Sequence, residues 1–171
     1  MTDKALVVLT GKSRDTLLKD GGTSHWVLTP AQVRGFKYAV CVRHANPPYD
    51  PGPGARPEPH GAAFLVGKIS DVKFTYTENG RDRYIVLFDA FADVWIEDFW
   101  DGSRNPVRYV NVTDINARGI DFDSLDWQPM PADEGDKTGA SDARLTIAAA
   151  KAGLAKTFGV AEDAIEIVIR A

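Results

Sequence analysis

The chain has one cysteine, three histidines and no long hydrophobic run among its 171 residues. Cys41 alone cannot form an internal disulfide, so the fold must be stabilised by a packed core, as is usual in a reducing cytoplasm. The apolar runs are too short to cross a bilayer, and the polar residues 1–4 are not typical of a secretory signal. We therefore expect a cytoplasmic protein with no membrane partner.

The composition is that of an ordinary globular protein. Hydrophobic residues make up 44% of the chain and charged residues 26%, which excludes wholesale disorder, collagen and coiled coil. A length of 171 residues suits one domain with a small appendage. The function must therefore be sought in the charge distribution and in local patterns.

Charge is distributed unevenly along the chain. Residues 1–88 carry 12 Lys or Arg and 8 Asp or Glu, residues 89–136 carry 3 and 12, and residues 137–171 carry 5 and 4. A protein that coats DNA would be more basic, because its affinity depends on several phosphate contacts. A local basic face on the first zone is left open, and the acidic zone either solvates loops or meets a basic partner.

Three segments differ in composition. We expect a β-rich binding domain over residues 1–128, a flexible acidic linker over 129–143 and a helix–strand unit over 144–171. The linker has almost no large apolar residue, so it cannot bury enough surface to order itself.

The first segment is rich in predicted strands. Apolar runs that suit strands cover residues 5–9, 38–42, 62–74, 84–96 and 105–112. Glu78, Asn79 and Gly80 predict a turn between the two longest runs, so residues 60–96 are expected to form a long hairpin. Residues 84–88 are apolar on both faces, which favours a central strand covered on both sides.

A helix is expected to flank these strands. Thr29 can cap a helix start, and Pro30 suits the first helical position because its missing N–H is not needed there. Together the patterns predict an α+β fold with a curved or barrel-like mixed β-sheet and a flanking helix.

The closing segment has its own helix and strand signals. Thr146 is a candidate N-cap, and the apolar residues Ile147, Ala150, Leu154 and Phe158 fall on one helical face. Gly159 suits the left-handed position that ends a helix, and the alternation at 165–169 predicts a strand. One helix and one strand cannot bury themselves, so this unit is expected to dock on the body, on a second copy or on a partner.

A proline-rich loop is the first candidate binding region. Residues 46–61 hold six of the ten prolines, and Arg43, His44 and Tyr49 lie in or beside this stretch. One interpretation is a stiff surface loop. The other is a recognition loop that frames a pocket, in which these three side chains contact an anion or stack on a flat ligand.

A second candidate region follows the apolar run at 84–96. Trp100 lies in a polar, turn-prone stretch, where an indole can serve as a stacking platform. Arg104, Arg108 and Tyr109 follow it, and the two arginines either neutralise nearby aspartates or bind a phosphate or carboxylate. Trp26 stands apart, and most aromatic residues are otherwise expected in the core.

Other motifs are incomplete. Residues 9–13 end like a phosphate-binding loop, but Leu6 stands where the first glycine is required. Cys41, His44 and His60 suggest zinc binding or a nucleophilic pair, but Cys41 lies in a predicted core strand. Residues 121–126 lack the glycine and the final glutamate of a calcium loop. No catalytic residue, metal ligand or cofactor is therefore predicted.

The order of predicted elements resembles the PUA-like superfamily, particularly its EVE and ASCH branches. The most similar part is Phe64-Leu65-Val66-Gly67-Lys68-Ile69-Ser70-Asp71-Val72, with its apolar-Gly-x-apolar pattern. The resemblance covers roughly residues 5–112 and implies a small mixed barrel with a helix beside its opening. It also implies binding of RNA or modified bases in a cleft lined by aromatic and basic residues. The acidic stretch, the proline loop and the closing unit depart from this pattern.

The sequence thus predicts a non-catalytic module that binds a nucleotide, a modified base or a short nucleic acid. The expected ligand-binding residues are Trp26, Arg43, His44, Tyr49, Trp100, Arg104, Arg108 and Tyr109. The alternative is a protein-interaction or inhibitor module that uses the acidic surface and residues 144–171, through which the chain would also self-associate. An enzyme using Cys41 with His44 or His60, or a metal, is a third interpretation.

Overall fold

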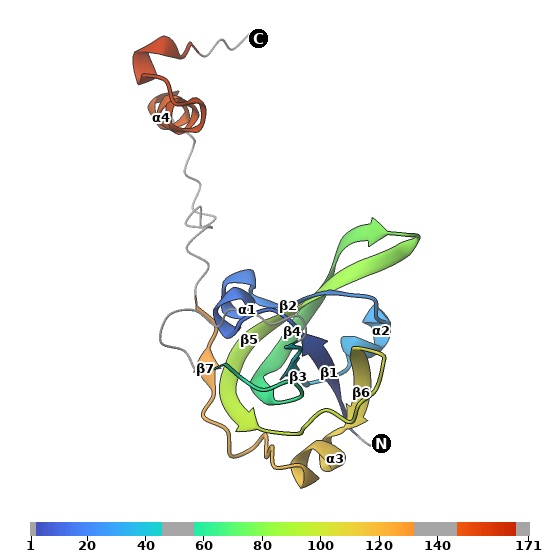
Figure 1. Ribbon diagram of the computed structural model, residues 1–171. Helices are drawn as coiled ribbons and strands as arrows, with labels where there is room; N and C mark the ends of the chain where they lie inside the picture. Colours follow the sequence, from blue (N-terminus) through green and yellow to red (C-terminus); the bar gives the residue numbers. More distant parts are fainter. Residues whose placement is uncertain (1–2, 46–56, 132–146, 167–171) are drawn as a thin grey trace. The chain divides into compact units, whose positions relative to one another are not determined.

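The computed structural model describes residues 3–45, 57–131 and 147–166 (Figure 1). The chain divides into two compact units, Met1–Asp133 and Glu134–Ala171, each of which is described by itself. Residues 132–143 of the expected linker and Thr146, the expected N-cap, lie outside the described residues. The helices in the described part are all too short or too polar to cross a membrane.

The described residues of the first unit form mainly strands, with three short helices. Its elements in chain order are β1 (Lys4–Thr10), α1 (Arg14–Asp20), β2 (Gly22–Trp26), α2 (Pro30–Val33), β3 (Tyr38–Arg43), β4 (Ala63–Glu78), β5 (Arg81–Ile96), β6 (Val107–Asn111), α3 (Val112–Ala117) and β7 (Gln128–Pro129). The α+β class and all the expected strands of this unit are confirmed. The helix expected after Thr29 is also present, although α2 is a single turn and Thr29 makes no side-chain cap bond.

All seven strands belong to one mixed sheet. The order is β2-β5-β4-β3-β1-β6. The short strand β7 lies off this path and pairs with Ala90 and Phe91 of β5, on the edge of β5 that faces away from β4. β1 and β3 are parallel, whereas the other pairs are antiparallel. In the described part of the chain β2 and β6 end the path without pairing to each other, so the hydrogen-bonded sheet is open.

The hairpin of β4 and β5 dominates this sheet and confirms the expected pairing of residues 60–96. Its two strands pair from Ala63 with Ile96 out to Glu78 with Arg81. Asn79 and Gly80 both have positive φ, 51° and 71°, as a two-residue turn of the type that matches strand twist requires. Figure 1 shows β5 bending sharply and the far end of the hairpin extending beyond the other strands.

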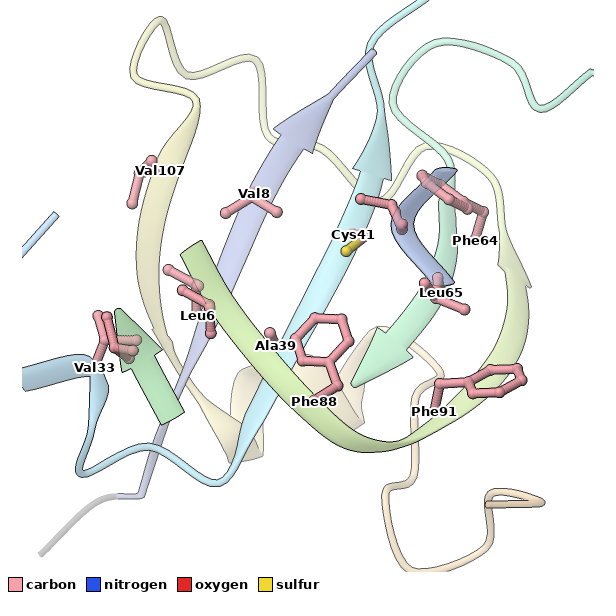
Figure 2. Close-up of a cluster of buried hydrophobic side chains, with 13 residues drawn as sticks. Leu6, Val8, Val33, Ala39, Cys41, Phe64, Leu65, Phe88, Phe91 and Val107 are labelled. Carbon is pink, nitrogen blue, oxygen red and sulfur yellow. The ribbon is translucent and has the colours of Figure 1, made fainter. Parts of the chain in front are cut away.

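The inner face of the sheet holds the larger core cluster. Leu6 and Val8 of β1, Cys41 of β3 and Phe88 of β5 lie within it, as Figure 2 shows. Gly67 is required there, because a Cβ at this position would overlap the Phe88 ring. The glycine of the apolar-Gly-x-apolar pattern therefore allows β5 to bend closely over β4.

The outer face carries a second cluster. Val7, Val40 and Val66 point to this side, and Phe99, Ile115 and Phe122 cover them from the chain that follows β5. Tyr38 stacks on Phe122 with ring centroids 4.1 Å apart and an interplanar angle of 5°. β1, β3 and the first part of β4 are therefore buried on both faces. The double cover expected for residues 84–88 is found on one face only, because Val86 and Phe88 are buried in the inner cluster whereas Ile85 and Leu87 are half-buried and belong to neither cluster.

The two ends of the sheet approach each other through side chains. The hydroxyl of Tyr109 on β6 accepts a hydrogen bond of 2.9 Å from the backbone N–H of Thr29, which follows β2. Phe36 packs edge-on against the Tyr109 ring at 5.3 Å. The segment around α2 therefore bridges β2 and β6 and covers the inner cluster.

The second unit contains α4 (Ile147–Phe158) and a short 3₁₀ helix (Glu162–Ala164). The predicted helix end is confirmed, because Gly159 has φ 66° and the N–H of Val160 donates to the Ala155 carbonyl at 3.1 Å. Of the strand expected at 165–169, residues 165 and 166 are not in strand conformation, and residues 167–169 lie outside the described residues.

Candidate functional site

The expected binding residues occupy several separate places. Tyr49 lies outside the described residues. Trp26 is half-buried against the inner cluster, and its indole N–H donates to the Thr23 hydroxyl at 3.0 Å. Arg104 is exposed in the turn before β6 and makes no salt bridge with any described residue. These positions do not form one cleft.

Arg43 is an internal residue of the first unit. Its side chain is fully buried, and its Nε lies 3.2 Å from a Glu58 carboxylate oxygen. Nη1 donates to the backbone carbonyls of Thr10 and Lys12 at 3.3 and 2.6 Å, and the guanidinium lies over Phe64, 4.1 Å from the ring centroid. Burial lowers the pKa of Arg43, and Glu58 opposes this shift. Arg43 thus fixes the loop after β1 instead of facing solvent.

The candidate metal or nucleophile group does not assemble around the cysteine. Cys41 is wholly buried, and burial raises the pKa of its thiol to about 12. His44 and His60 do meet, with ring centroids 5.4 Å apart. Among the described residues, no group of three or more His, Cys, Asp or Glu could hold a metal ion. A protonated, inaccessible thiol is a poor nucleophile.

Trp100 and Arg108 are brought together in a small hollow on the outer face. Its volume is about 180 Å³. We call it the Trp100 hollow, and its lining residues are Val7, Phe99, Trp100, Asp101, Arg108, Val110, Asp114 and Arg118. The floor is therefore apolar and aromatic, and the rim is charged.

The turns on either side of Trp100 hold its ring in place. Asp98 and Gly102 have positive φ, 53° and 81°, so the chain reverses tightly before and after Trp100. The Trp100 indole N–H donates to the Ser103 carbonyl at 3.1 Å, and its backbone N–H donates to the Gly61 carbonyl at 3.0 Å. The end of the proline-rich loop therefore anchors this tryptophan.

Of the two arginines on the rim of the hollow, Arg108 forms a salt bridge and Arg118 forms none with a described residue. Arg108 Nη1 lies 2.6 Å from a carboxylate oxygen of Asp101. The backbone N–H of Ser103 and then Arg108 lower the pKa of Asp101, so this carboxylate is ionised at neutral pH. Arg118 donates to the Phe99 carbonyl at 2.8 Å, and in the described part of the chain it makes no salt bridge.

A second, wider hollow adjoins Arg108. It has a volume of about 560 Å³, and Val27, Leu28 and Tyr109 line it together with Arg108. Neighbouring residues of a strand face opposite sides, so Arg108 belongs to the outer face and Tyr109 to the inner one. Arg108 therefore lines both hollows.

Arg118 is the site residue that the sequence patterns missed. It follows α3, a helix of six residues that the sequence patterns did not predict. The available signal was that only three cations, Arg104, Arg108 and Arg118, interrupt the acidic stretch at 89–136. Two of these three meet at the Trp100 hollow.

No family model, no curated protein and no solved structure matches this chain. The PUA-like resemblance therefore stays a prediction from the sequence.

Proposed function

We propose that the first unit is a non-catalytic binding module that takes a nucleobase or nucleotide into the Trp100 hollow. The observation that carries this proposal is the convergence of Trp100, Arg108 and Arg118 around one small cavity. An aromatic floor with adjacent cations is the combination that binds a flat base attached to a phosphate.

The size of the hollow suits part of a nucleotide. Its volume of about 180 Å³ is below the range of about 300–1,000 Å³ that holds a whole drug-sized ligand. The base would therefore occupy the Trp100 hollow, and the sugar and phosphate would lie outside it, towards Arg118 or along Arg108. The Asp101 carboxylate would accept an N–H of the base, since an ionised carboxylate is only an acceptor.

The proposal agrees with the expectation that the PUA-like resemblance implies. In that interpretation the curved sheet acts as an incompletely closed barrel, whose ends are joined by the contact between Thr29 and Tyr109. The module would work in the cytoplasm, where nucleotides and RNA are abundant.

A fluorescence titration of the full chain with nucleoside monophosphates, and with short RNA and DNA, tests this function. Binding should quench tryptophan emission, and Trp100→Ala should abolish most of the quenching. Trp95→Ala, which removes another partly exposed indole, is the matched control and should leave the affinity unchanged. Unaltered emission with every ligand, at both low and high salt, would contradict the proposal.

A protein-interaction module is the second candidate, and one observation in the second unit favours it. Leu154, Phe158 and Val160 are 39%, 70% and 46% exposed. Exposed apolar side chains gathered on α4 and just after its end are typical of a surface that another molecule covers. Analytical ultracentrifugation of the full chain and of Phe158→Ser tests this candidate: loss of an associated species in the variant would support it, and identical monomers would contradict it.

A further inference from the structure

Three aromatic side chains lie on the adjacent strands β2, β5 and β4. Trp26 on β2 lies opposite Tyr84 on β5, and Tyr84 lies opposite Phe74 on β4. Directly opposite residues of antiparallel strands share one face of the sheet. The Phe74 and Tyr84 rings are in edge contact, with centroids 6.1 Å apart. We call these three residues the aromatic row.

Exposure increases along this row. Trp26 and Tyr84 are half-buried against the inner cluster, whereas Phe74 is 55% exposed. The row lies where β2 still pairs with β5, and Figure 1 shows the far end of the hairpin extending past the other strands of the first unit. The row therefore begins in the core and ends at a ring that solvent reaches.

A β-bulge separates the row from a second aromatic pair. The register shifts between Phe74 and Tyr76, so that Tyr76 lies opposite Arg83. Since Arg83 and Tyr84 face opposite sides of β5, Tyr76 lies on the other face, where its ring is 5.1 Å from that of His25. The aromatic row is thus confined to one face, and Phe74 is its outermost member.

Charge near the row is positive, in contrast to the acidic stretch at residues 89–136. Residues 21–37 and 71–84 together hold five Lys or Arg and three Asp or Glu, whereas residues 89–136 hold three and twelve. Arg34 Nη2 donates to the Val72 carbonyl at 2.8 Å, two residues from Phe74. Its side chain is 54% exposed and its Nε lies 4.0 Å from Asp71, so the cation remains accessible.

We propose that the aromatic row binds unpaired bases of single-stranded nucleic acid, with Phe74 as the outer stacking surface and Arg34 beside the phosphates. Aromatic side chains on adjacent strands stack successive bases in sheet-based RNA-binding domains. Stacking accepts any base, and nearby cations give the affinity its salt dependence. This surface is separate from the Trp100 hollow, so the inference goes beyond the proposed function and does not depend on it.

Fluorescence anisotropy with labelled ten-nucleotide single-stranded RNA and DNA, measured on the full chain, tests this proposal. Phe74→Ala should weaken binding by about 5- to 100-fold, the range for loss of one base–aromatic stack. Phe74→Trp should retain binding. Trp95→Ala is the matched control, because it removes an exposed aromatic residue of β5 outside the row. As Phe74 is largely exposed, its variants should melt at the wild-type temperature.

The outcomes separate this proposal from the proposed function. Loss of oligonucleotide binding in Phe74→Ala but not in Trp100→Ala supports the aromatic row, whether or not the hollow binds mononucleotides. Loss in Trp100→Ala alone would overturn the row and leave the hollow intact. Equal binding by Phe74→Ala and wild type, or no binding by either, would also overturn it. Light scattering adds one further outcome: a dimer that Phe74→Ala converts to a monomer would show that a second copy covers this face.

Discussion

The backbone carbonyl of Gly61 accepts a hydrogen bond of 3.0 Å from the backbone N–H of Trp100. Gly61 is the last residue of the proline-rich stretch, and its own N–H donates to the Arg43 carbonyl at 2.9 Å. Two regions that the sequence marks as separate binding candidates are therefore joined at one residue. Backbone hydrogen bonds of Gly61 thus connect the buried Arg43, which stabilises the fold, to Trp100, which lines the hollow.

Gly61→Ala should disturb the Trp100 hollow. Gly61 has φ 86°, and an added Cβ would lie 3.4 Å from the Trp100 Cβ. We expect a loss of about 1–2 kcal/mol in the free energy of unfolding, as for a left-handed alanine, together with altered tryptophan emission. Gly80→Ala is the control, because Gly80 also has positive φ but nothing lies within 4 Å of the added Cβ. Unchanged emission in Gly61→Ala would show that this contact does not position Trp100.

Gly67→Ala should be among the most destabilising substitutions in the first unit. The added Cβ would overlap the buried Phe88 ring, and overpacking of a core typically costs about 1–3 kcal/mol. Gly153→Ala, in contrast, should raise stability. Gly153 lies inside α4 with nothing within 4 Å of the added Cβ, and alanine stabilises a helix by up to about 1 kcal/mol relative to glycine. Chemical denaturation measures both. A Gly67→Ala protein as stable as wild type would contradict the close approach of β5 to β4.

Arg43→Met should destabilise the first unit by about 3–5 kcal/mol, the cost of removing one partner of a buried ion pair. The variant loses the guanidinium that contacts Glu58 and the donors to the Thr10 and Lys12 carbonyls. Arg104→Met, at an exposed position, should change stability by no more than about 0.5 kcal/mol. If both variants unfold at the same denaturant concentration, Arg43 does not have the structural role assigned to it.

The Cys41 thiol should resist alkylation in the folded protein. Burial raises its pKa to about 12 from an ordinary value of 9.0, so at pH 8 about one molecule in ten thousand carries a thiolate. Because the folded state favours the protonated thiol, the free energy of unfolding should fall as the pH rises from about 9 towards 12. Mass spectrometry after iodoacetamide treatment, with and without denaturant, checks the reactivity. Rapid labelling without denaturant would contradict the burial of Cys41.

Much of the sheet could be predicted because its signals are local. The turn at Asn79 and Gly80 and the apolar runs on either side of it specify the β4–β5 hairpin without reference to the rest of the chain. The strand β2 was missed because Thr23 and Ser24 are polar. These residues are nevertheless buried, since the curved sheet folds over them. The helix α1 was also missed, since it has only seven residues and buries only Leu17.

The candidate site was predictable only in part. The exposed turn around Trp100 could be predicted from the residues beside it, and Arg108 follows it closely along the chain. Arg43 resembled a surface cation, because its burial depends on Glu58 and on the loop after β1, which no local pattern reveals. Arg118 reaches the hollow through α3 and its contact with the Phe99 carbonyl, and the row of Trp26, Tyr84 and Phe74 arises from strand pairing. The neighbours of these residues therefore appear only in the folded chain.

A titration of the indole N–H signals of the ¹⁵N-labelled full chain with nucleoside monophosphates tests the central claim most directly. The chain has four tryptophans, and single substitutions assign their signals. The account predicts a saturable shift of the Trp100 signal, with the Trp95 and Trp127 signals unmoved. A Trp100 signal that stays in place at saturating ligand, or a shift confined to another indole, would contradict it.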